Sequence, residues 1–85
     1  MSPAQHMKRT ELERDVLKAK NLLAAARVEY EMALDTLAEG ADAQPPRISR
    51  NMLALELTVS QLVALECRHA VAVERLQVFN REVMS

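Results

Sequence analysis

The sequence predicts an all-α fold, an antiparallel two-helix hairpin that packs like a coiled coil. Among the 85 residues there are two aromatic side chains, Tyr30 and Phe79, one glycine and three prolines. Ala, Leu, Glu, Arg and Val dominate, a composition typical of long helices. The glycine and two of the prolines fall in the middle of the chain, between stretches of nearly equal length. Equal arms joined by a short loop form a hairpin, and we expect residues 1–85 to be one domain.

The first helix is expected over residues 3 to about 39. Ser2 can cap a helix that has Pro3 at its first position, and Gln5 can complete a capping box. Thr10 and Glu13 offer a second capping box with the same spacing. The helix therefore begins either near residue 3 or near residue 11.

A regular apolar repeat runs through this first helix and is the strongest signal in the sequence. Its spacing is 4-3-4-3 over almost four heptads, which predicts a coiled-coil seam. Three of the eight members are alanine, which lets a neighbouring helix approach closely. The members are Leu12, Val16, Ala19, Leu23, Ala26, Tyr30, Ala33 and Leu37.

A turn is expected at residues 40–45. Gly40 can take up the left-handed conformation that ends many helices. Pro45 and Pro46 forbid continuation of the first helix, and either one suits the opening of the next. The second helix is then expected over residues 46 to about 83.

The second helix carries two apolar stripes. The stripe expected to face the first helix is interrupted at Glu66 and His69. Its apolar members are Ile48, Met52, Leu55, Val59, Leu62, Val73 and Leu76. The second stripe lies on nearly the opposite side of the helix. Its members are Leu53, Leu57, Ala64, Cys67, Val71 and Val78.

A two-helix hairpin has no third layer that would cover the second stripe. A long exposed apolar strip marks a binding surface or an oligomer interface. The sequence favours two interpretations equally: the second stripe binds a different protein, or it binds further copies of the chain in a four-helix bundle. Side chains of the first helix that lie off its seam extend the apolar surface. They are Leu17, Val28, Met32 and Leu34.

Charge and hydropathy exclude several classes of protein. The 11 basic and 12 acidic residues are interspersed, so no field of one sign would attract nucleic acid. Apolar runs are far shorter than the ~20 residues of a membrane span, and no signal peptide is expected. The single Cys67 cannot form an internal disulfide. We expect a cytoplasmic protein.

The polar residues of the second helix do not indicate catalysis. Glu66 and His69 have the spacing used in carboxylate-bridged di-iron bundles, but one copy is a weak match and a polar break beside Lys20 is the simpler interpretation. Cys67 and His69 are two positions apart on a helix and cannot converge on one ion. His6 has no neighbouring ligand. We therefore expect no enzyme, no metal and no cofactor.

The pattern resembles the small E-component co-chaperones of bacterial type III secretion systems, the YscE, SsaE and EscE group. The residues that carry the resemblance are the Leu/Ala-rich segment 32–37, the turn from Gly40 to Gln44, and the Leu/Glu cluster 51–56. The resemblance implies a helical hairpin that pairs with a helical-repeat chaperone in the cytoplasm. Together the two would keep the secretion needle subunit unpolymerised before export.

The expected partner-binding residues come mostly from the second stripe. The alternative function is a self-assembling coiled-coil adaptor that forms a homo-oligomeric bundle. The same residues would serve either function. They are Val28, Met32, Leu53, Leu57, Ala64, Cys67 and Val71.

Overall fold

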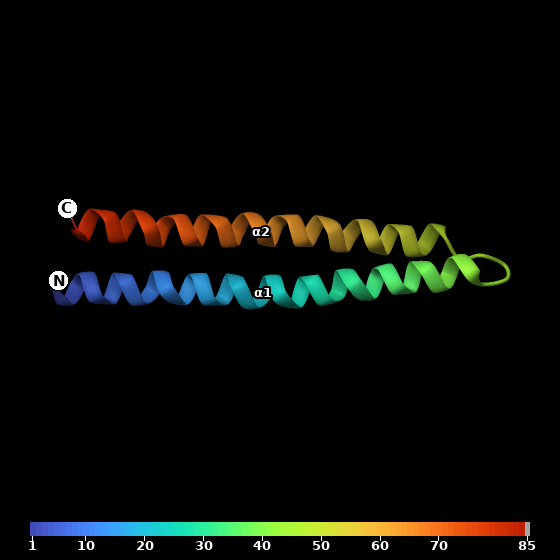
Figure 1. Cartoon of the computed structure of the whole chain (residues 1–85), viewed down its shortest axis with the longest axis horizontal. Coiled ribbons are helices and arrows are strands. Elements are labelled where there is room, and N and C mark those ends of the chain that lie inside the picture. Colours follow the sequence, from blue (N-terminus) through green and yellow to red (C-terminus); the bar gives the residue numbers. More distant parts are fainter. Residues whose placement is uncertain (85) are drawn as a thin grey trace.

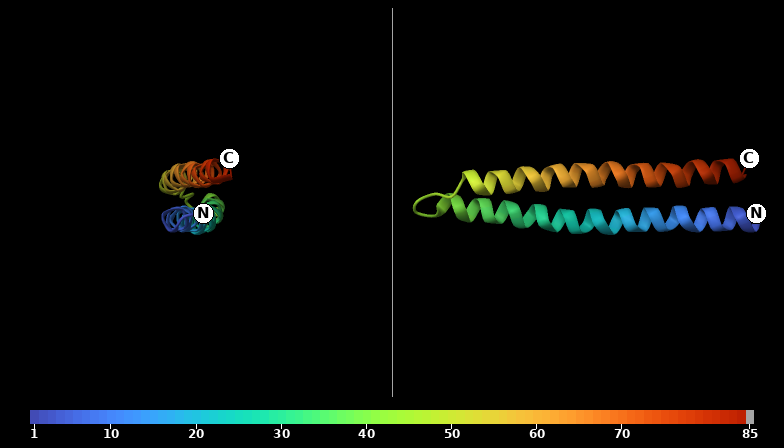
Figure 2. Two further views of the ribbon diagram at one scale, coloured as in Figure 1. Left: turned by 90° about the vertical axis from the view of Figure 1, so that its left-hand side faces the viewer. Right: turned by 180° about the vertical axis from the view of Figure 1, so that it is seen from behind.

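A computed structural model describes residues 1–84 as two antiparallel α-helices (Figure 1). Helix α1 is Pro3–Asp42 and helix α2 is Ser49–Met84. The molecule is a rod of 65 × 15 × 13 Å, and the views from the end and from behind show two helices side by side with both termini at one end (Figure 2). The predicted all-α hairpin is confirmed. A rod this thin has no third layer.

The first of the two possible helix starts is the one that forms. The Gln5 N–H donates to Ser2 Oγ at 3.2 Å, and the Ser2 N–H donates to Gln5 Oε1 at 2.8 Å, which completes the capping box. The Thr10 hydroxyl donates instead to the His6 carbonyl, one turn earlier in the same helix. Helix α1 therefore begins at Pro3.

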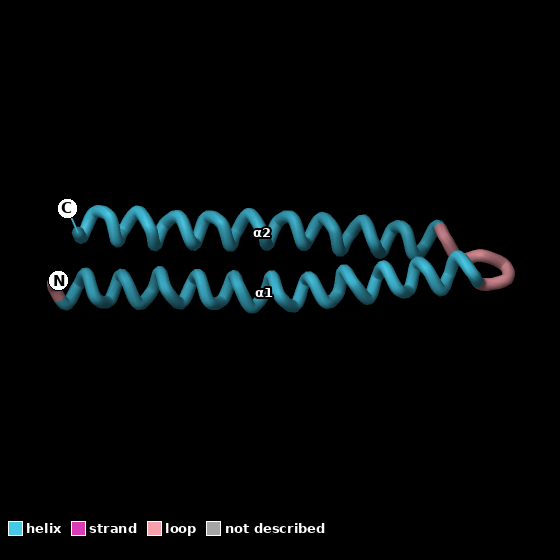
Figure 3. The backbone as a smooth tube through the Cα atoms, in the orientation of Figure 1, coloured by secondary structure: helices cyan, strands magenta, loops and turns pink. Residues whose placement is uncertain are grey.

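The loop lies about three residues later than the sequence predicted (Figure 3). Helix α1 continues through Gly40 to Asp42, and Gly40 has no positive φ, so the expected left-handed helix stop was wrong. Neither Pro45 nor Pro46 opens helix α2, which starts at Ser49.

Gly40 allows a close approach of the two helices at the turn. Its carbonyl oxygen accepts hydrogen bonds from the N–H groups of Ala43 and Arg47, at 3.3 and 2.8 Å. A Cβ at this position would collide with the Asn51 side-chain amide and come within 2.8 Å of the Arg47 carbonyl oxygen. The glycine is needed here for space rather than for its backbone freedom.

The seam predicted for α1 is confirmed at every position. Leu12, Ala19, Leu23 and Ala26 are buried, and the other four members are partly buried. Along both flanks of the seam the side chains are exposed. The coiled-coil repeat of α1 therefore fixes which face of this helix meets α2.

The stripe of α2 that meets α1 differs from the prediction by a rotation of about 50° around the helix. Four of the seven predicted members, Leu55, Leu62, Val73 and Leu76, are partly buried, as expected. The other three, Ile48, Met52 and Val59, are exposed. Ten of the covered positions repeat with 4-3 spacing, and we call these ten the inner seam of α2; Val73 and Asn80 are covered beside it. The ten are Asn51, Leu55, Thr58, Leu62, Leu65, His69, Ala72, Leu76, Phe79 and Val83.

Hydrogen bonds explain why two polar residues, Asn51 and Thr58, can occupy the inner seam. Asn51 Nδ2 donates to the Thr36 carbonyl oxygen at 3.3 Å, and the Thr58 hydroxyl donates to the Leu55 carbonyl oxygen at 2.8 Å. Satisfied polar groups cost little when they are partly buried. In the C-terminal half the same repeat continues through the covered residues Leu65, Ala72 and Phe79.

Two contacts between the helices set their register. Arg9 Nη2 donates to Asn80 Oδ1 at 3.1 Å near the termini, and Asn51 bonds to Thr36 near the turn. Counting inward from both contacts places Ala26 opposite Leu62. In the same register, alanines of α1 lie opposite larger side chains of α2. Because the alanine side chains are small, the two helices can pack closely.

Candidate protein-binding surface

Helix α2 carries a second coiled-coil repeat on the side that faces away from α1. It has the same 4-3 spacing as the inner seam and lies about 160° around the helix from it. We call it the outer seam. Its members are Leu53, Leu57, Ser60, Ala64, Cys67, Val71, Glu74 and Val78.

All eight positions of the outer seam are exposed. Leu53 and Leu57 expose 59% and 60% of their surface, more than most leucines of a folded domain, and Val71 exposes 48%. Cys67 is a free, exposed thiol. Six of the eight members are apolar or thiol side chains, and the polar Ser60 and Glu74 occupy the other two positions. The outer seam is therefore a largely apolar helix-binding pattern that no part of residues 1–84 covers.

The structure divides the seven predicted partner-binding residues between two sides of the rod. The five on α2 all belong to the outer seam. Val28 is exposed on α1 on the side that faces away from α2, so it cannot share one continuous surface with Leu57. Met32 is also exposed, and it lies on α1 outside the seam that meets α2.

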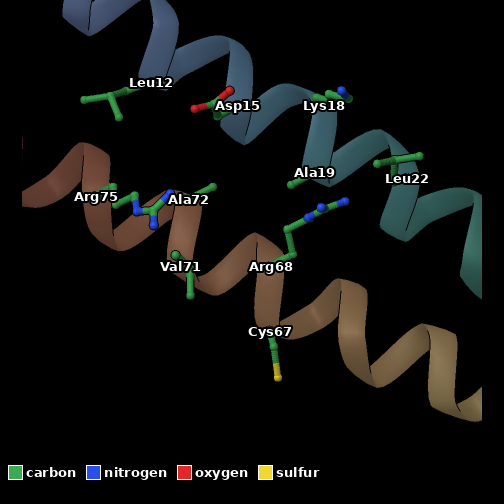
Figure 4. A pocket seen from close by; sticks show the side chains of 10 residues that line it. All are labelled: Leu12, Asp15, Lys18, Ala19, Leu22, Cys67, Arg68, Val71, Ala72 and Arg75. Atoms are coloured by element: carbon green, nitrogen blue, oxygen red, sulfur yellow. The ribbon is translucent and has the colours of Figure 1, made fainter.

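A shallow groove of about 550 Å³ runs between the helices in the terminal half, and the outer seam forms one of its edges. The alanines Ala19 and Ala72 lie at its floor, while Cys67 and Val71 point away from α1 (Figure 4). Its charged lining consists of three basic side chains and one acidic side chain. They are Lys18, Arg68, Arg75 and Asp15. A segment that binds along this edge therefore meets net positive charge.

The polar residues considered for chemistry do not come together. His69 lies in the inner seam and is partly buried, whereas Glu66 is exposed beside that seam. Among residues 1–84 no ion pair links Glu66 to Lys20. Within the same residues, no three acidic, histidine or cysteine side chains gather closely enough to hold a metal ion.

The predicted second stripe contained only the apolar members of the outer seam. Ser60 and Glu74 complete the 4-3 repeat but are polar, so a search for apolar residues omits them. Val63 exposes 53% of its surface beside the seam and was also missed. The regular spacing was the signal that would have found Ser60 and Glu74, whereas Val63 lies outside the repeat.

Comparison with protein-family models, with curated proteins and with solved structures finds no match for the chain. Neither helix of the part described here has a stretch long and apolar enough to cross a membrane. The fold and the outer seam together define a helical hairpin with one unpartnered coiled-coil face.

Proposed function

We propose that this protein is a non-catalytic protein-binding module that docks a helix of another polypeptide along the outer seam. The observation that carries the proposal is the eight-position repeat of exposed side chains on α2. A helix laid into this repeat buries apolar or thiol side chains at six of its eight positions, which is the way coiled-coil partners recognise each other.

The hairpin suits this task because its own stability does not use the outer seam. The seam of α1 and the inner seam of α2 face each other, and the outer seam remains available. Partner binding therefore adds a third helix to a formed pair. The basic groove beside Cys67 and Val71 favours a partner helix with acidic residues on that flank.

The particular function we propose is that of a type III secretion co-chaperone in the cytoplasm. The partner would be a helical-repeat chaperone, and the two would hold a needle subunit unpolymerised. The resemblance of segments 32–37, 40–44 and 51–56 to that family supports the proposal. The chemistry is compatible, since repeat proteins expose amphipathic helices at their ends that an added helix can cap.

The test is affinity isolation of the tagged protein from its source cells, followed by mass spectrometry. Wild type should retain a helical-repeat protein in stoichiometric amount, and Leu57→Glu should lose it, since a carboxylate cannot be buried unpaired in an apolar seam. Leu17→Glu is the matched control, because Leu17 is equally exposed but lies on α1, away from the outer seam.

Circular dichroism of both variants should show wild-type helicity, because neither leucine lies in a seam between the two helices. The proposal is overturned if Leu57→Glu retains the same proteins as wild type. Loss of helicity in Leu57→Glu would also contradict it, because Leu57 would then belong to the core of the hairpin.

A further inference from the structure

We infer that in the free protein a second copy of the chain occupies the outer seam, with the two α2 helices antiparallel about a two-fold axis between Ala64 and Cys67. This inference rests on the proposed function in taking the outer seam as a helix-binding surface. It also identifies the helix that covers this surface when no other partner is present, namely α2 of a second copy.

The repeat itself is symmetric under this pairing. The outer seam runs from residue 53 to residue 78, so its centre lies between Ala64 and Cys67, close to the middle of Ser49–Met84. When two copies run antiparallel with Ala64 of one opposite Cys67 of the other, every member of the seam meets a member of the other seam. The layers are Leu53 with Val78, Leu57 with Glu74, Ser60 with Val71, and Ala64 with Cys67.

The side chains at the centre of the pairing are small. Ala64 and Cys67 lie nearest the two-fold axis, and both are exposed in the single hairpin. Small residues at a crossing let two helices approach closely, as the alanines of α1 do within the hairpin. The larger leucine and valine side chains lie toward the ends, where they widen the apolar contact.

The flanks of the seam also fit an antiparallel copy. Val63 of one helix comes beside Ala70 of the other, and both are exposed in the single hairpin. On the other flank, Arg68 comes beside Gln61, which can accept a hydrogen bond from the guanidinium group.

Charge favours the antiparallel orientation over the parallel one. A parallel pair would place Glu74 against Glu74 of the second copy within the seam, which is destabilising. The antiparallel pair separates the two carboxylates. Arg50 and Arg81 meet beyond the last apolar layers, where Arg81 is already paired with Glu74 of its own chain at 3.2 Å.

The arrangement makes self-association and partner binding mutually exclusive, because both use the outer seam. A partner helix must displace the second copy. The apparent affinity for a partner should therefore fall as the concentration of the protein rises above the dissociation constant of the dimer.

Sedimentation equilibrium of the purified chain tests the inference without any partner. Wild type and Leu17→Glu should have twice the mass of one chain, and Leu57→Glu should have the mass of one chain. A monomeric wild type at every concentration would overturn the inference. The proposed function would still be judged separately by the affinity isolation.

Cysteine cross-linking tests the orientation, in a Cys67→Ser background with a short thiol cross-linker. A chain with both Leu53→Cys and Val78→Cys should cross-link to a covalent dimer. The single variants Leu53→Cys and Val78→Cys should not, because each cysteine would lie about 37 Å from its own copy. Cross-linking of a single variant to itself would show parallel helices and overturn the antiparallel pairing. A dimer of Leu57→Glu in the sedimentation experiment would show that the outer seam is not the dimer interface.

Discussion

Alanine residues of α1 determine how closely the two helices pack. Ala19 and Ala26 are among the most buried side chains of residues 1–84, with 3% and 5% of their surface exposed. Because alanine loses no side-chain entropy on burial, these positions favour the helix and the close approach together. The same residues bury little apolar area. The folded state therefore depends strongly on the few large side chains of the seam.

Leu23 is the residue at which this dependence is easiest to measure. Leu23→Asp should unfold the hairpin, because an unpaired buried carboxylate costs several kcal/mol, comparable with the total stability of a small domain. Leu17→Asp should change the free energy of unfolding by no more than about 0.5 kcal/mol. Circular dichroism during urea unfolding measures both variants. A folded, cooperative Leu23→Asp would show that the seam of α1 is not the core.

At the scale of the helices, the turn is held by one glycine and one asparagine. The Gly40 carbonyl oxygen accepts from Arg47, and Asn51 reaches back to the Thr36 carbonyl oxygen. These bonds fix where α2 begins to run alongside α1. They also fix the rotation of α2, because Asn51 is the first member of its inner seam.

Gly40→Ala tests the close approach at the turn. An added methyl group would displace Asn51 and crowd the Arg47 carbonyl oxygen, and we expect a loss of about 1–2 kcal/mol even though alanine favours helices. Asn51→Ala should cost about 1 kcal/mol for the lost hydrogen bond. Urea unfolding of the two single variants and the double variant gives the free energy of interaction between the two substitutions.

In the Asn51→Ala background the cost of Gly40→Ala should be smaller, because the side chain that collides with the new methyl group is gone. Stabilisation by Gly40→Ala in the wild-type background would contradict the account of the turn. It would mean that the two helices separate there without loss of packing.

The contrast between the two helices shows what sequence could predict. In α1 the 4-3 repeat is apolar at every position from Leu12 to Leu37, so hydropathy and periodicity agree and the seam was predicted completely. In α2 the inner seam includes Asn51, Thr58 and His69, while Met52 and Val59 beside it are apolar. Hydropathy therefore favoured a stripe rotated from the true one. Hydrogen bonds and facing alanines decided the outcome, and neither is visible in one helix alone.

The outer seam was predicted more fully than the inner seam of α2. Its six apolar members do not compete with any neighbouring stripe, so their pattern alone placed them away from α1, and all six are exposed. The relation between helices was harder to foresee. Val28 was grouped with Leu57 because both are apolar and lie off the seams expected between the helices, but they lie on opposite sides of the rod.

At the scale of the whole molecule, a rod of 65 × 15 × 13 Å buries a single narrow seam along its length. Chains this short fold with a small margin of stability unless their surface is covered by something else. The outer seam gives the molecule a second line of apolar contacts as long as most of α2. Covering that seam would therefore stabilise the hairpin and fulfil its proposed function at once.

The most direct test of this central claim uses the native thiol of Cys67, which lies in the middle of the outer seam and is exposed in the single hairpin. In a fresh extract of the source cells, N-ethylmaleimide should label Cys67 of the wild type several-fold more slowly than Cys67 of Leu57→Glu, because thiol reactivity follows access. Urea should make the two rates equal. Equal rates in the untreated extract would contradict the account, since the outer seam would then be uncovered where the protein works.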